Sequence, residues 1–140
     1  MSVLDRLRGQ SKWQHEDPLV RASAVDDLED DAQDLLTAIA SEDVDPGVRV
    51  AAVVRLFDPE TLGRIAHADQ DGTVRGHAVA LLRTMALDGT AAERAAGALA
   101  GLTEARDISE VARLARLEGI SESALARLSG QKMISAVARR

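Results

Sequence analysis

Three histidines, His15, His67 and His77, are the side chains of this chain best suited to metal binding or to acid–base catalysis at neutral pH. His67 and His77 are ten residues apart, and Asp69 and Asp71 lie between them. This spacing matches no known metal-ligand pattern, and the chain has no cysteine that could complete a thiolate site. A weak adventitious metal site is conceivable there, but we predict no functional metal site and no cofactor.

Sequence motifs for catalysis are missing as well. The chain has no nucleophile elbow, no phosphate-binding loop, no dinucleotide fingerprint and no zinc-protease motif. No serine has a histidine at a spacing that indicates a nucleophile and its base. We therefore expect no catalytic residue and predict that the protein is not an enzyme.

The densest charge cluster is the acidic run 26–31, which is followed by Asp34. One interpretation is a solvated turn whose carboxylates interact favourably with the N-terminus of the next helix. The alternatives are binding of a basic partner or of Ca²⁺, although the spacing lacks the EF-hand pattern and its glycine.

Arg21, Arg49 and Arg75 recur at intervals of 28 and 26 residues. They lie in three segments, 17–28, 45–56 and 71–82, that share the pattern D-[P/G]-x-V-R-x-x-A-x-x-x-L. The Val, Ala and Leu positions are i, i+4 and i+8, so they share one face of a helix. The aspartate suits the N-cap and proline suits the first helical position, so each segment predicts a helix start.

The recurring arginines have two interpretations. In one, they form a ladder that binds an acidic partner. In the other, each arginine bonds to carboxylates or helix-end carbonyls of neighbouring repeats, such as Asp17, Asp45 and Asp71.

A second type of helix precedes most of these segments. It carries the pattern L-x-x-I-A at residues 36–40 and 62–66. Each repeat is thus predicted to be a hairpin of this helix A and a following helix B. Between Leu82 and Leu102 the repeat is shortened, and Thr90 and Glu93 have the spacing of a capping box. The expected helices cover residues 18–28, 32–41, 46–57, 59–68, 72–86, 90–103, 107–118, 121–129 and 131–139, with a possible short helix near 2–9.

Composition favours packed helices. Hydrophobic residues make up 46% of the 140 residues, but Trp13 and Phe57 are the only aromatic ones. No apolar stretch has the length of a membrane span, and we expect a cytoplasmic protein. The net charge is −6, and residues 16–62 hold thirteen acidic side chains against three arginines. An acidic surface repels phosphate, which disfavours nucleic-acid binding.

Trp13 lies just before the first repeat. It is predicted either to cover the N-terminal end of the array or to be an exposed anchor for a partner, since tryptophan is enriched at binding hot spots. The candidate partner-binding residues are Trp13, Arg21, Arg49, Arg75 and His77.

The D-x-x-V-R-x-x-A-x-x-x-L pattern, preceded by L-x-x-I-A, resembles HEAT-like repeats of a short type, closest to those of the phycobilisome-lyase type. The segment 12–21, KWQHEDPLVR, is similar to the start of HEAT-like arrays at the N-terminus of certain large proteobacterial proteins of unknown function. The resemblance implies an all-α, right-handed α-α superhelix of about four to five short hairpins. It carries over no catalytic residue.

This resemblance implies a non-catalytic scaffold or adaptor that binds another protein. The alternatives are a lyase-like accessory subunit that acts on a cofactor-bearing protein and, less in keeping with the composition, a HEAT-like DNA-repair enzyme. We expect one domain over residues 1–140, with a cap segment at 1–16, regular repeats at 17–86 and degenerate repeats at 87–140 that end in a half-repeat. The expected state is a monomer, or a weak homodimer through the C-terminal helices.

Overall fold

The computed structural model describes the backbone of residues 12–138 and the side chains of residues 13–131. The short helix expected near residues 2–9 lies outside the described residues. Between residues 12 and 138 every regular element is a helix and none is a strand, so the all-α class is confirmed.

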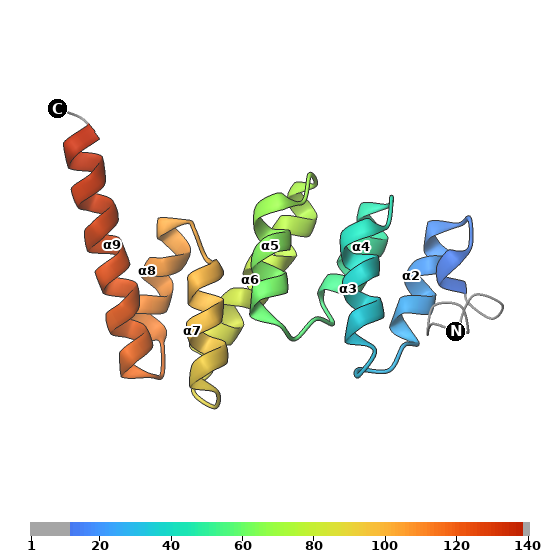
Figure 1. The fold of residues 1–140 in the computed structure, drawn as a ribbon, viewed down its shortest axis with the longest axis horizontal. Coiled ribbons are helices and arrows are strands. Elements are labelled where there is room, and N and C mark those ends of the chain that lie inside the picture. Colours follow the sequence, from blue (N-terminus) through green and yellow to red (C-terminus); the bar gives the residue numbers. More distant parts are fainter. Residues whose placement is uncertain (1–11, 139–140) are drawn as a thin grey trace. The chain divides into compact units, whose positions relative to one another are not determined.

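Eight α-helices follow a short 3₁₀-helix, η1, and Figure 1 labels the α-helices along the chain. Their bounds are η1 (Lys12–Gln14), α2 (Pro18–Asp26), α3 (Gln33–Glu42), α4 (Pro46–Val53), α5 (Pro59–Ala68), α6 (Gly72–Leu87), α7 (Ala92–Gly101), α8 (Ala105–Leu114) and α9 (Glu118–Ala138).

The chain divides into two compact units. Unit 1 extends to Phe57 and includes residues 64–78, and unit 2 consists of residues 58–63 and the chain from Val79 onward. The helices α5 and α6 therefore each contribute residues to both units.

The core of unit 1 is made by the apolar positions of the repeat pattern. On α4 and the turn after it, Val48, Ala52 and Leu56 are 1%, 0% and 3% exposed, as their shared helical face predicts. Leu36 and Ile39 of α3 are buried as well, and α3 packs against α4. In α3 and α4 the two sequence patterns thus become the two apolar faces of one helical hairpin.

Aspartates cap the helices of the repeats, as their positions predict. Asp17 accepts a hydrogen bond from the amide of Leu19, and Asp45 accepts one from Val48. Asp71 accepts from the amides of Thr73 and Val74. Each cap satisfies donors that a helix N-terminus leaves free, which fixes where the helix begins.

The helix α4 ends at Val53 rather than near residue 57 as expected. The Gln33 side chain binds the backbone that leaves this helix: its Nε2 donates to the Arg55 carbonyl at 3.0 Å, and its Oε1 accepts from the Phe57 amide at 3.1 Å. Because these backbone groups are bonded to a side chain of α3, they are not part of a further helical turn.

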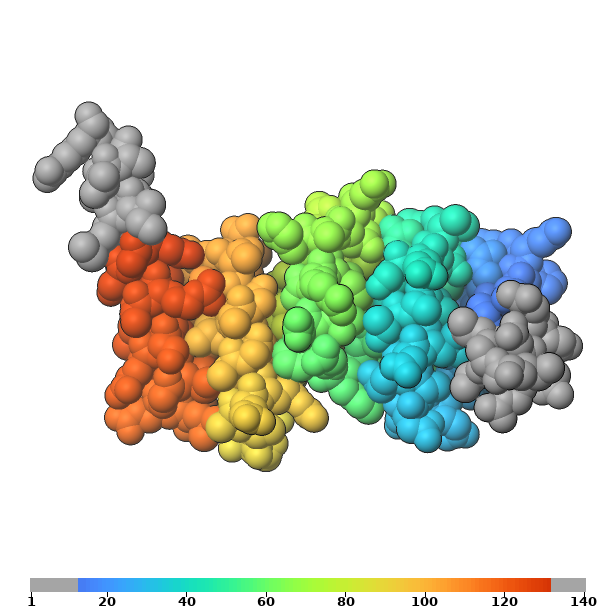
Figure 2. All heavy atoms as spheres, in the orientation of Figure 1, coloured from blue at the N-terminus to red at the C-terminus, as the bar shows by residue number. Residues whose placement is uncertain are grey.

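Unit 2 contains a close contact between two helical segments. A Cβ placed on Gly101 of α7 would lie 3.3 Å from the Cα of Gly63, and one on Gly97 would lie 3.2 Å from the Pro59 ring. The glycines at these positions allow the backbones to approach closely. Further along this unit, α8 lies side by side with α9 (Figure 2, orange to red).

The capping box expected at Thr90 and Glu93 is wrong. The N-cap of α7 is Ala91, and no side chain bonds to it. Thr90 is instead bonded to Asp88, whose carboxylate accepts from both the Thr90 amide and the Thr90 hydroxyl. The Thr90 hydroxyl thus belongs to a local turn with Asp88 rather than to a cap of α7, and the N-cap lies one residue later than the pattern indicates.

The break expected between helices 121–129 and 131–139 is also wrong, because α9 is continuous from Glu118 to Ala138. Ser129 and Gly130 lie where the break was expected, and neither a proline nor an aspartate cap follows them. A single glycine costs about 1 kcal/mol relative to alanine within a helix, which is too little to end a helix that is otherwise supported.

The continuity of α9 predicts the effect of Gly130→Ala. Apart from its chain neighbours and the backbone of its own helix, no described atom lies within 4 Å of a Cβ placed at residue 130, so alanine fits without strain. We expect the free energy of unfolding to rise by about 0.5–1 kcal/mol in urea titration, because alanine is the better helix former. Gly76→Ala, in α6 with equally open space, is the matched control. A gain at residue 76 with a loss at residue 130 would contradict a continuous α9.

Candidate functional site

Arg21 binds the turn between α3 and α4. Its Nε and Nη2 donate to the two carboxylate oxygens of Asp43, each at 3.0 Å. Its Nη1 donates to the carbonyls of His15 and Glu16 at 2.8 and 3.0 Å. The side chains of Arg21 and Asp43 are only 12% and 10% exposed, so the pair is largely removed from solvent.

Arg49 repeats this geometry one repeat later. Its Nε and Nη2 donate to the two oxygens of Asp69 at 3.0 and 3.1 Å. Its Nη1 donates to the Asp43 carbonyl at 2.8 Å. Two successive arginines therefore use the same atoms for the same three bonds, and such two-pronged guanidinium–carboxylate pairs are the strong ones.

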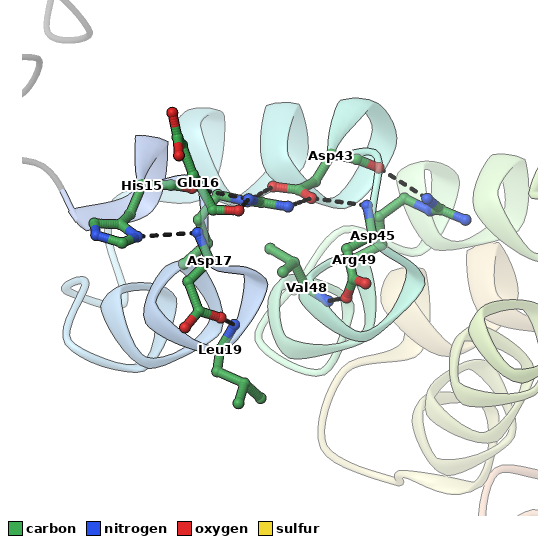
Figure 3. Close-up of polar contacts among 9 residues, drawn as sticks. His15, Glu16, Asp17, Leu19, Asp43, Asp45, Val48 and Arg49 are labelled. Carbon is green, nitrogen blue, oxygen red and sulfur yellow. Dashed lines mark hydrogen bonds and ion pairs between the residues drawn. The ribbon is translucent and has the colours of Figure 1, made fainter.

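Each bound aspartate also organises its own turn. Asp43 Oδ1 accepts from the Asp45 amide at 2.9 Å, and Asp69 Oδ1 accepts from the Asp71 amide at the same distance. We call the segments 43–45 and 69–71 the Asp-x-Asp turns. Figure 3 shows the first one, with the Asp43 carboxylate bonded to both a guanidinium and Asp45 while its carbonyl faces Arg49. The second aspartate of each turn is the N-cap of the next helix.

The corresponding turn at residues 15–17 differs in one residue. His15 occupies the position of Asp43 and Asp69, and its Nδ1 accepts from the Asp17 amide at 3.0 Å. The imidazole thus reproduces the turn bond without offering a carboxylate to an arginine (Figure 3).

Opposing influences act on the Asp69 carboxylate. Burial is the largest single influence and would raise its pKa, but hydrogen bonds from Arg49 and from the Asp71 amide, together with the charges of Arg49 and Arg75, outweigh it. The net result is a pKa below the ordinary value of 3.8. The ionised carboxylate is therefore the form that this turn stabilises.

The predicted site residues fall into distinct places. The three arginines lie at the turns. Arg21 and Arg49 bond to carboxylates of the neighbouring repeat, as one of the two interpretations expected. These carboxylates belong to Asp43 and Asp69 rather than to the N-cap aspartates that the sequence suggested. Arg75 donates to the Asp69 carbonyl at 2.6 Å. His77 is exposed on α6. A role of these residues in partner binding stays a prediction.

Trp13 borders a cavity of about 270 Å³ that also touches α3. Leu35, Ala38 and Ile39 form its apolar side, and Glu42 lies at its edge. The Trp13 Nε1 is buried and has no acceptor among the described residues. The ring thus lies beside α3, and whether it covers the end of the array or anchors a partner stays a prediction.

Two further arginines, Arg55 and Arg127, were missed from the sequence. Arg55 donates to the carbonyls of Val25 and Leu28, where α2 ends. Arg127 donates to the Leu99 and Leu102 carbonyls at 2.6 and 2.7 Å, where α7 ends. Cations bonded to final carbonyls stabilise a helix C-terminus. The signal was present, because each arginine directly precedes the closing leucine of its segment.

One buried carboxylate was also missed. Asp107 in the first turn of α8 is only 2% exposed, and its Oδ1 lies 3.5 Å from Nη1 of Arg83. Nη2 of Arg83 is 3.6 Å from Glu110. The geometry is that of a loose ion pair, since Asp107 Oδ1 and Arg83 Nε have no hydrogen-bond partner among the described residues.

No cluster of metal-binding side chains occurs among the described residues. In the same part of the chain, no helix is both long and apolar enough to pass through a bilayer. No family model matches the chain, and no match was found among curated proteins or solved structures. The geometry of the arginine pairs is therefore the main guide to function.

The lowered pKa of Asp69 predicts how stability depends on pH. A carboxylate with a depressed folded-state pKa stabilises the fold above its unfolded pKa, and this contribution is lost as the pH falls through the folded value. We expect Asp69→Asn to lower the free energy of unfolding at neutral pH by about 1–3 kcal/mol and to flatten its decline below about pH 4. Urea unfolding followed by circular dichroism at several pH values measures both effects.

Removing the guanidinium provides the control. In an Arg49→Met background, the further change Asp69→Asn should alter the pH dependence much less, because the principal partner of the carboxylate is gone. An unchanged decline below about pH 4 in the Asp69→Asn single variant would show that Asp69 is not held ionised by this turn.

Proposed function

We propose that the chain is a short HEAT-like α-solenoid that acts as a non-catalytic scaffold and binds another protein. The main support for this proposal is that one bonding geometry repeats along the chain. In it, an arginine of one helix B binds the Asp-x-Asp turn that precedes the next helix B. Arg21 with Asp43 and Arg49 with Asp69 are the two instances. Such identical bonds between successive hairpins support a tandem array.

Exposed apolar side chains support binding to a protein. Val44, at the centre of the first Asp-x-Asp turn, is 87% exposed, and Leu19 in the first turn of α2 is 79% exposed. Phe57, one of only two aromatic residues, is 49% exposed. Rigid turns that present apolar side chains beside charged groups suit recognition of a polypeptide better than of a small polar substrate.

Other parts of the sequence-based expectation remain proposals. They include the right-handed superhelix, the cytoplasmic location and the oligomeric state. A weak homodimer through the C-terminal helices would have to form through the single continuous helix α9.

Site-specific photo-crosslinking in the cells from which the chain derives tests the scaffold proposal. A photoreactive residue is placed at exposed positions of helices B, Ser23 and His77, and at exposed positions of helices A, Ser41 and His67. We expect one discrete crosslinked protein from helix B positions and little product from helix A positions, because a scaffold engages its partner through one face.

The matched helix A positions serve as the internal control. Absence of a crosslinked protein at all four positions would contradict a binding function. Equal products from both faces would indicate non-specific contact and would contradict a defined binding surface.

A further inference from the structure

The guanidinium of Arg75 is only partly used. Its Nη1 donates to the Asp69 carbonyl at 2.6 Å, which is the bond that Arg49 makes to the Asp43 carbonyl. Its Nε and Nη2 have no acceptor among the described residues. The side chain is neither buried nor fully exposed. We call Nε and Nη2 of Arg75 its open edge.

In the two preceding repeats the same edge is occupied. Arg21 and Arg49 each direct Nε and Nη2 at both oxygens of an aspartate that follows by 22 or 20 residues. The residues at these two distances after Arg75 are Ala95 and Gly97, and neither has a carboxylate. The chain thus supplies the arginine of a third pair without its aspartate.

We propose that the open edge of Arg75 binds an aspartate carboxylate of the partner protein. This inference rests on the proposed scaffold function and assigns one contact within it. The bond from Nη1 to the Asp69 carbonyl is the one that Arg49 makes to the Asp43 carbonyl, and it restricts the guanidinium while the open edge stays available for a two-pronged bond. Pre-orientation lowers the entropy lost on binding, and the planar fork matches a carboxylate.

The expected partner segment is a turn of the Asp-x-Asp type. In both internal pairs the bound aspartate also accepts from the amide two residues later, at 2.9 Å. That bond holds the carboxylate in position while it meets the arginine. A partner turn with the same local bond presents its aspartate in the same way.

A second copy of this chain is a poor occupant. Of its three turns of this kind, the one at residues 15–17 has His15 in place of the aspartate. The aspartates that do have the required geometry, Asp43 and Asp69, are already bound to Arg21 and Arg49.

The test observes the arginine side chains of the whole chain by NMR, with ¹⁵N-labelled arginine and the Arg75→Lys variant to assign the Arg75 Nε–Hε signal. The probe is a capped peptide of residues 41–47, which contains the first Asp-x-Asp turn, and its matched control carries Asp43→Asn. We expect the Arg75 signal to shift with the aspartate peptide and at least fivefold less with the asparagine peptide. Arg113, which is exposed, is the control signal and should not respond.

Two further titrations distinguish the source of the anion. Acetate at equal carboxylate concentration should shift the Arg75 signal less than the aspartate peptide does, because it lacks the turn. Inorganic phosphate should also act more weakly. Equal shifts of Arg75 and Arg113, a response to acetate as large as that to the peptide, or a stronger response to phosphate would each overturn the proposal.

The crosslinked partner provides a second readout that separates this inference from the scaffold function. Arg75→Lys should reduce the crosslinked product at least tenfold, and Arg113→Lys should leave it unchanged. A product that persists unchanged in Arg75→Lys overturns the role of Arg75 and leaves the scaffold function intact. The absence of any product in the unsubstituted chain counts against the scaffold function itself.

Discussion

The guanidinium of Arg49 joins three separate pieces of unit 1. It extends from α4, binds the carbonyl of Asp43 before that helix, and holds both carboxylate oxygens of Asp69 after α5. Both charged groups are mostly shielded from water, with 13% and 8% of their side chains exposed. A shielded charge without a partner is costly, so each member of the pair requires the other to remain in place. The positions of the turns, and hence of the helices that begin at them, depend on this bond.

Unit 2 fixes its helices with related but different contacts. Ser121 stands where the repeat pattern has arginine, and its hydroxyl donates to the Ala112 carbonyl near the end of α8. Arg127 binds the carbonyls that end α7 in the way that Arg55 binds those that end α2. Contacts between arginine and helix-end carbonyls are therefore present in both units. The two-pronged arginine–aspartate pairs among the described residues both lie in unit 1. This difference leaves Arg75 as the point where the series of pairs ends within the described chain.

The sequence predicted what depends on local chemistry. Helix starts at Asp17, Asp45 and Asp71 followed from capping, and the buried face of Val48 and Ala52 followed from helical spacing. The identity of the bound carboxylates did not follow, because Asp43 and Asp45 are both near the turn and only the folded backbone decides which faces an arginine. Asp107 was missed because a charged residue in the first turn of a helix is normally solvated, and its burial depends on tertiary packing. The continuity of α9 was missed because glycine weakens a helix without ending it.

A double-mutant cycle on each pair tests most directly whether the arginine–aspartate bonds hold the hairpins together. The cycles combine Arg21→Met with Asp43→Ala and Arg49→Met with Asp69→Ala, and the free energies of unfolding come from urea titration. The account predicts a favourable coupling of about 1–3 kcal/mol in both cycles, similar in size because the two geometries match. Coupling near zero in both cycles, with the single variants simply additive, would contradict it.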